Sequence, residues 1–173
     1  MNDNKKTVSK DDDDDDVILE KVRAYILEDK SKDDWNDEKV KQILFDETEN
    51  LVPSLYDIEQ KYSAGLSSIH CAAGIGHVGV VKLLIENGVD PDDVNSFKKT
   101  ALHVAVLEDF VDVAKVLLEN DADVNAVDED KHTALHFAVT EGYLDIVYML
   151  VHNGADVNAV QRNKYTVLHL AAK

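Results

Sequence analysis

The sequence predicts an all-α repeat protein, in which pairs of short helices stack side by side and a helical region precedes the first pair. Three observations predict this fold class. A short phrase built around a histidine recurs at intervals of 33 residues. Apolar segments with helical spacing follow the first three copies at a constant distance. The 173 residues are 45% hydrophobic and carry a net charge of −17, which fits a folded and strongly acidic chain.

The repeating phrase opens with Ser or Thr and carries a histidine three residues later. Its four copies are Ser67–Ala72, Thr100–Ala105, Thr133–Ala138 and Thr166–Ala171. A Ser or Thr oxygen can accept a hydrogen bond from a backbone N–H of the first helical turn, so each copy predicts the start of a helix. The apolar residue before each histidine and the alanine two residues after it predict a buried face. These apolar residues are Ile69, Leu102, Leu135 and Leu168.

A second apolar segment follows each of the first three phrases with the spacing of an amphipathic helix, and in the first unit it spans 80–85. The Asn-Gly pairs at 87–88 and 153–154 predict where such helices end, because glycine takes a positive φ at little cost. Asp121 holds the place of this glycine in the middle unit, where the same φ costs up to about 1 kcal/mol. Each period therefore predicts two helices.

These features resemble ankyrin repeats, which have the same 33-residue period and a Thr-Pro-Leu-His phrase. The proline of that phrase is replaced here by Ser68, Ala101, Ala134 and Val167. The segment 128–160 matches that pattern best. The resemblance implies stacked helix pairs with β-hairpin loops. By the same resemblance, residues 62–94, 95–127 and 128–160 are three full units, and residues 161–173 begin a fourth.

The glycine that the family places at the hairpin tip remains only as Gly65. Lys98, Lys131 and Lys164 replace it in the other units. A positive φ costs a lysine about 1 kcal/mol, so we expect these turns to adopt another geometry.

The region before the repeats divides into two parts. Residues 1–16 include six consecutive aspartates, whose mutual repulsion predicts a disordered acidic tail. Residues 17–61 predict helices, the first from about 17 to 29 by its apolar spacing and a short one after Ser54. The segment 40–45 resembles the second helix of a unit. Residues 17–61 are therefore either a degenerate capping repeat with an insertion or a separate small helical domain.

The last residue, Lys173, falls inside the first predicted helix of the fourth unit. A repeat array needs a terminal unit with a polar outer face, and such a unit is missing from this sequence. We therefore expect a truncated product, a fragment of a longer protein, or an array that a partner completes.

The composition excludes several classes of function. A net charge of −17 opposes binding to nucleic acid. The sequence contains no run of about eighteen apolar residues, so we expect no membrane insertion. It also has no secretory signal and a single cysteine, Cys71, which favours a soluble protein of a reducing compartment such as the cytoplasm.

Histidine and cysteine side chains are the obvious candidates for chemistry. The family resemblance implies that His70, His103, His136 and His169 are buried structural residues and not metal ligands. Cys71 occupies a position that is apolar in the other units, and no base is placed to activate it. We predict no catalytic residue, no cofactor and no metal site.

The resemblance also implies where a partner protein would bind, namely the hairpin loops and the exposed end of each first helix. The predicted contact residues are Leu66, Ile75, Phe97, Lys99, Leu107, Glu108, Glu129, Asp130, His132, Glu141, Arg162 and Tyr165. The apolar members of the first two units predict an anchor for an apolar partner side chain, and the acidic members predict a partner with basic groups. Alternatively, Leu66 and Ile75 pack against residues 17–61. A second hypothesis makes Lys98, Lys131 and Lys164 a basic ladder that meets an acidic segment.

The function predicted from these features is non-enzymatic binding of a protein partner, whose identity and stoichiometry the sequence does not specify. One alternative is the substrate-recruiting part of a larger enzyme. Another is an effector that an intracellular bacterium secretes into the host cytosol.

Overall fold

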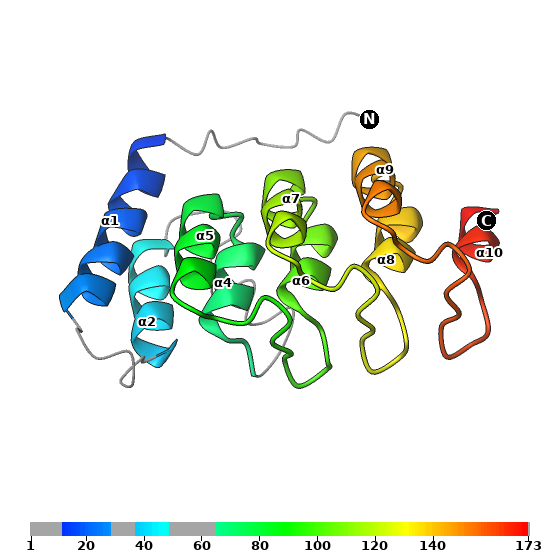
Figure 1. Cartoon of the computed structure of the whole chain (residues 1–173), viewed down its shortest axis with the longest axis horizontal. Coiled ribbons are helices and arrows are strands. Elements are labelled where there is room, and N and C mark those ends of the chain that lie inside the picture. Colours follow the sequence, from blue (N-terminus) through cyan, green and yellow to red (C-terminus); the bar gives the residue numbers. More distant parts are fainter. Residues whose placement is uncertain (1–11, 29–36, 49–64, 173) are drawn as a thin grey trace, which may run out of the picture.

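The computed structural model describes residues 12–28, 37–48 and 65–172, which form helices stacked in two rows (Figure 1). One row contains α4 (Ser68–Gly74), α6 (Ala101–Leu107), α8 (Ala134–Glu141) and α10 (Val167–Ala171). The other contains α5 (Val78–Glu86), α7 (Val111–Glu119) and α9 (Leu144–His152). Each helix packs against the next helix of its own row and, within a unit, against its partner in the other row. The predicted all-α fold of stacked helix pairs is confirmed.

The four helices of the first row begin at a cap that involves the repeated histidine. The cap residue is Ser67, Thr100, Thr133 or Thr166. In each case its backbone N–H donates to the histidine Nδ1, and its hydroxyl lies within hydrogen-bonding distance of the same atom. An atom that accepts a backbone N–H carries no proton, so the proton of the neutral ring must lie on Nε2. The histidine thus takes the role that Glu or Gln has in a capping box.

The core runs continuously through the stack. Ile69, Leu102 and Leu135 are buried at equivalent positions, as predicted, together with the alanines that follow the histidines. The prediction was wrong for the fourth unit, because Leu168 is 67% exposed. No described helix packs on the outer side of α10, so this side chain has nothing to cover it. In the described part of the chain, no helix is long and apolar enough to cross a membrane.

Two longer helices precede the repeats, α1 (Asp12–Glu28) and α2 (Asp37–Thr48). The helix α1 begins five residues before the predicted start at Val17 and takes in most of the aspartate run. Carboxylates are stabilised at the positive end of a helix dipole, which offsets their mutual repulsion. The predicted tail of residues 1–16 is therefore too long at its C-terminal end. The short helix predicted after Ser54 lies outside the described residues.

The helix pair α1–α2 covers the first unit in reversed order. The second helix of this pair, α2, packs on α4, and α1 packs on α5 (Figure 1). Asp37 Oδ1, at the start of α2, accepts the backbone N–H of Ser68 at 2.9 Å. The predicted equivalence of residues 40–45 with the second helix of a unit is therefore wrong, since that equivalence would place α2 beside α5.

Candidate functional site

The turns that precede α6, α8 and α10 project from the same side of the stack (Figure 1). In the first of them, Asn95 N–H donates to Lys99 O at 3.0 Å, and Lys98 N–H donates to Asn95 O at 2.9 Å. Among the described residues, the only β pairing is an isolated bridge between Val160 and Thr166. The predicted β-hairpin loops are thus tight turns without strands in this part of the chain. We call residues 95–99, 128–132 and 161–165 together the turn strip.

A side-chain oxygen fixes the first two turns of the strip from inside. Asn95 Oδ1 accepts the backbone N–H groups of Phe97 and Lys99 at 3.0 and 2.9 Å. Asp128 Oδ1 makes the equivalent pair of bonds one unit later, to Asp130 and His132, both at 2.9 Å. Such bonds use backbone donors that the turn itself leaves unpaired, so they hold one backbone conformation.

The tip lysines keep the backbone conformation of the glycine that they replace. Gly65 has a φ of 78°, and Lys98, Lys131 and Lys164 have φ values of 58°, 63° and 64°. The predicted change of turn geometry is therefore wrong. Backbone hydrogen bonds that close all three turns hold the lysines in the left-handed region in spite of its cost, and side-chain bonds from Asn95 and Asp128 reinforce the first two turns.

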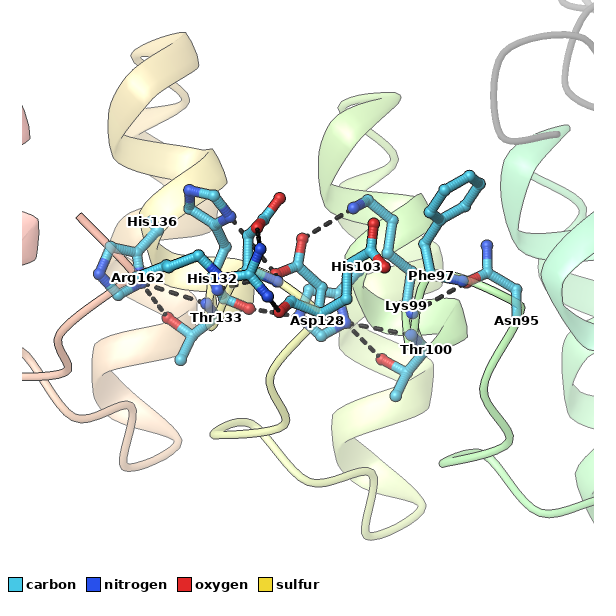
Figure 2. Close-up of polar contacts among 12 residues, drawn as sticks. Asn95, Phe97, Lys99, Thr100, His103, Asp128, His132, Thr133, His136 and Arg162 are labelled. Atoms are coloured by element: carbon cyan, nitrogen blue, oxygen red, sulfur yellow. Dashed lines mark hydrogen bonds and ion pairs between the residues drawn. The ribbon is translucent and has the colours of Figure 1, made fainter.

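Bonds between neighbouring turns join the strip into one surface, which Figure 2 shows in close-up. Lys99 Nζ lies 2.8 Å from Asp128 Oδ2, and Glu129 N–H donates to Phe97 O at 3.0 Å. From the turn 161–165, Arg162 Nη1 lies 2.7 Å from Asp130 Oδ1. Arg162 also donates from its backbone N–H to Asp130 O at 2.8 Å. The acidic turn of the third unit is thus held by cations from both neighbouring turns.

The Asp128 carboxylate lies at the centre of this network, and its side chain is only 2% exposed. Burial alone would raise its pKa. The hydrogen bond from Lys99 Nζ, the backbone bond from His132 and the charge of Lys99 outweigh burial and hold the pKa below its ordinary value. The carboxylate is therefore ionised at neutral pH.

Aromatic rings lie beside these charges. Lys99 Nζ is 5.1 Å from the ring centroid of Phe137, a distance at which a cation–π attraction operates. The His132 ring stands 5.2 Å from the same ring. Phe97 and Tyr165 add side chains that are 36% and 40% exposed. The strip therefore offers apolar ring surface between fixed charges.

The sequence matches a known protein-family model over most of its length. The family model described as ankyrin repeats, in three copies, matches residues 32–128, 69–161 and 125–173. The chain belongs to the ankyrin-repeat family. A comparison with curated proteins finds no match. Ankyrin repeats are generally protein–protein interaction modules, and their stacked units form extended concave binding surfaces.

The predicted contact residues of the ankyrin units fall into two groups. The turn strip contains Phe97, Lys99, Glu129, Asp130, His132, Arg162 and Tyr165. Leu107, Glu108 and Glu141 lie at the far ends of α6 and α8. A helix rises about 1.5 Å per residue, so the length of α6 separates the two groups by about 10 Å. Leu107 and Glu108 are half-buried, whereas Glu141 is exposed.

Two predicted contact residues are not available to a partner. Leu66 is 6% exposed and Ile75 is 2% exposed, so their assignment to an apolar anchor is wrong. They belong to the same buried cluster as Val40 and Leu44 of α2. The alternative interpretation, in which both residues pack towards the N-terminal region, agrees with this burial.

Two residues of this surface were not among the predicted contact residues: Asp128, which belongs to the turn strip, and Phe137, a residue of α8 whose ring lies beside it. Asp128 could have been recognised by its register, because it follows Asn95 by one period and both residue types accept backbone N–H groups in turns. The position of Phe137 is apolar in every unit, so the sequence contains no signal that distinguishes this ring from core.

The turn 161–165, in the fourth ankyrin unit, lacks the side-chain hydrogen bonds that fix the turns 95–99 and 128–132. Gln161 occupies the position of Asn95 and Asp128, and its Oε1 is buried without a hydrogen-bond partner. His136 Nε2 is also unpartnered, whereas His103 Nε2 lies 3.2 Å from the carbonyl oxygen of His132. Gln is one methylene longer than Asn or Asp, which moves its oxygen away from the turn N–H groups. The bond network therefore weakens between the third and fourth units.

Replacing Gln161 by Asp is expected to stabilise the fourth turn. The shorter side chain can accept the backbone N–H groups of Asn163 and Tyr165, a gain of about 1 kcal/mol. Hydrogen exchange of the amides in 161–171 measures this gain as increased protection. Replacing Gln161 by Glu adds the same charge but keeps the longer side chain, so it should give no such protection. Equal protection in both variants would contradict the role assigned to side-chain length.

Proposed function

We propose that this chain is a non-enzymatic cytoplasmic module that binds a partner protein through the turn strip and the far ends of α6 and α8, where Leu107, Glu108 and Glu141 lie. The partner places one apolar side chain beside Phe97 and another beside Tyr165, and it presents basic groups to the exposed carboxylates. One observation carries the proposal: exposed aromatic side chains stand on a surface whose backbone is fixed by bonds within and between turns.

Fixation of the turn strip matters because binding costs conformational entropy when loops must first become ordered. In the turns 95–99 and 128–132, the bonds from the Asn95 and Asp128 side chains and the bonds between neighbouring turns are present in the free chain. The cost of ordering is therefore met during folding. A surface of this kind binds with the aromatic and arginine side chains that interface centres favour.

The charges on this surface indicate which charged groups the partner carries. Asp128 and Asp130 are already paired with Lys99 and Arg162, so they offer little to a partner. Glu129 and Glu141 are exposed, and the chain as a whole carries a net charge of −17. Basic groups on the partner would meet these carboxylates and would accelerate association at low salt.

The proposal predicts that replacing Phe97 and Tyr165 together by serine weakens partner binding by at least tenfold, because both rings are lost from the contact. The measurement is quantitative affinity capture from a cell extract, followed by titration of the enriched partner. Both side chains are more than one-third exposed, so circular dichroism should show a fold that is retained.

A matched control is the pair Leu144→Ser and Tyr148→Ser. Both residues are strongly exposed on α9 and lie outside the turn strip. Partner binding should survive this change. Equal recovery of the partner by the Phe97/Tyr165 variant and by the wild type would refute the assignment of the site.

A further inference from the structure

Three lysines hold backbone positions that suit glycine. Lys98, Lys131 and Lys164 have positive φ values, and Gly65 holds the same position in the first unit. A side chain in this region clashes with its own backbone, so each lysine costs free energy that a glycine avoids. Backbone strain of this kind is concentrated at functional sites.

The side chains of these tip lysines are exposed and unused. Among the described residues, none of the three ammonium groups forms an ion pair or hydrogen bond, in contrast to the neighbouring Lys99 and Arg162. The strain is therefore not offset by any contact of the lysine side chains within the described part of the chain. The three positive charges are therefore exposed to solvent at the tips of consecutive turns.

The turn strip differs in charge from the rest of the molecule. It contains five cationic side chains and three acidic ones, whereas the whole chain has a net charge of −17. The cationic residues are Lys98, Lys99, Lys131, Arg162 and Lys164, and the acidic ones are Asp128, Glu129 and Asp130. Lys99 and Arg162 are paired with Asp128 and Asp130, so within the part of the chain that the structure describes the tip lysines are the unpaired cationic side chains of the strip.

We propose that Lys98, Lys131 and Lys164 form a docking surface for a short acidic segment of a partner protein, separate from the apolar contact at Phe97 and Tyr165. Packed helices stand about 8–10 Å apart, so three successive tips span about 20 Å. An extended chain covers this length with about six residues. Long polyanions such as nucleic acid do not fit, because they would extend over the acidic surface that surrounds the strip.

A fluorescent peptide of six aspartates tests the proposal against the full chain by anisotropy at low ionic strength. The wild type should bind the peptide, and binding should weaken as salt is added. Replacing all three tip lysines by glycine should weaken binding at least tenfold while leaving Tm equal to or above that of the wild type, since strain is removed. Replacing them by glutamine should weaken binding to the same extent with the strain retained.

The matched control removes three positive charges elsewhere, through Lys21→Gln, Lys82→Gln and Lys115→Gln on α1, α5 and α7. Its affinity for the peptide should stay within twofold of the wild type. Three results would overturn the proposal: unchanged binding by the glycine variant, an equal loss in the control, or tighter binding of a six-nucleotide single strand than of the peptide. None of these results depends on Phe97 or Tyr165, so the experiment tests the lysine surface separately from the proposed apolar contact.

Discussion

Replacing Asp128 by alanine is expected to destabilise the chain by about 2–4 kcal/mol. The change leaves the backbone N–H groups of Asp130 and His132 without their acceptor, and it leaves the half-buried Lys99 ammonium without its carboxylate. Urea unfolding followed by circular dichroism measures the free energy of unfolding. A loss below about 0.5 kcal/mol would mean that this side chain does not hold the turn.

The variant Asp128→Asn separates the two contributions of the carboxylate. Asparagine keeps the acceptor oxygen, as Asn95 does one unit earlier, but it removes the charge that faces Lys99. The expected cost is about 1–2 kcal/mol, since charged hydrogen bonds contribute more than neutral ones. A destabilisation equal to that of alanine would show that the charge, and not the turn bonds, carries the effect.

A double-mutant cycle then measures the interaction energy between Lys99 and Asp128, which belong to neighbouring units. Lys99→Met removes the ammonium group while keeping a side chain of similar length beside the Phe137 ring. The double variant with Asp128→Asn should cost less than the sum of the single changes by about 1 kcal/mol, because each single change leaves one charged partner behind. Strict additivity would indicate that the two groups do not interact.

Most of the repeat architecture could be predicted from the sequence because its determinants are local. Each cap residue, its histidine and the apolar residues around them lie within six positions, and the 33-residue period shows which positions are equivalent. The burial of Ile69, Leu102 and Leu135 follows from that register. The exposure of Leu168 does not follow from that register, because burial at this position requires a further helix packed on α10.

Contacts distant in sequence were harder to predict. Leu66 and Ile75 are buried in one cluster with residues of the N-terminal helix pair, and nothing in the repeat pattern specifies the reversed order of α1 and α2. A signal was nevertheless present: one period later, these two positions hold Lys99 and Glu108. An apolar residue at a position that is polar in other units indicates an additional neighbour.

The turn lysines illustrate a different limit of sequence reasoning. Their residue type argues against a positive φ, yet Lys98, Lys131 and Lys164 all adopt one. Intrinsic preference was outweighed by the backbone hydrogen bonds that close each turn, and the bonds of Asn95 and Asp128 add to them in two of the three turns. Such cooperative fixation depends on the geometry of the whole turn and not on the residue at its tip.

Acid is expected to destabilise the chain between pH 6.5 and pH 4 through the buried histidines. Burial lowers the pKa of His103 from 6.5 to about 4, more than its bond to the carbonyl of His132 raises it. The folded state therefore binds fewer protons than the unfolded state in this window. Stability is fully present above pH 6.5 and falls as pH drops towards 4, by about 3 kcal/mol for this one residue. The pKa values of His70 and His136 are lowered by burial too, so they add to the loss in the same direction.

The chemical reason lies at Nδ1 of His103, which accepts the backbone N–H of Thr100 at 3.1 Å. A proton on this atom would turn the acceptor into a donor facing a donor, and it would place a charge in a side chain that is almost fully buried. Replacing His103 by Gln keeps a donor and an acceptor but does not titrate. This variant should be less stable at pH 7, because its geometry only approximates that of the ring, and its stability should fall less steeply between pH 6.5 and 4.

The comparison with the wild type is essential because acid also neutralises carboxylates. Protonation of Asp and Glu reduces the self-repulsion of a chain with a net charge of −17, which opposes the histidine effect. Both proteins share this contribution, so the difference between their unfolding free energies at pH 7 and pH 5 reports His103 alone. Replacing the exposed His152 by Gln provides a control for the loss of one histidine. Parallel slopes for the wild type and His103→Gln would show that the buried ring does not set the acid stability of the repeats.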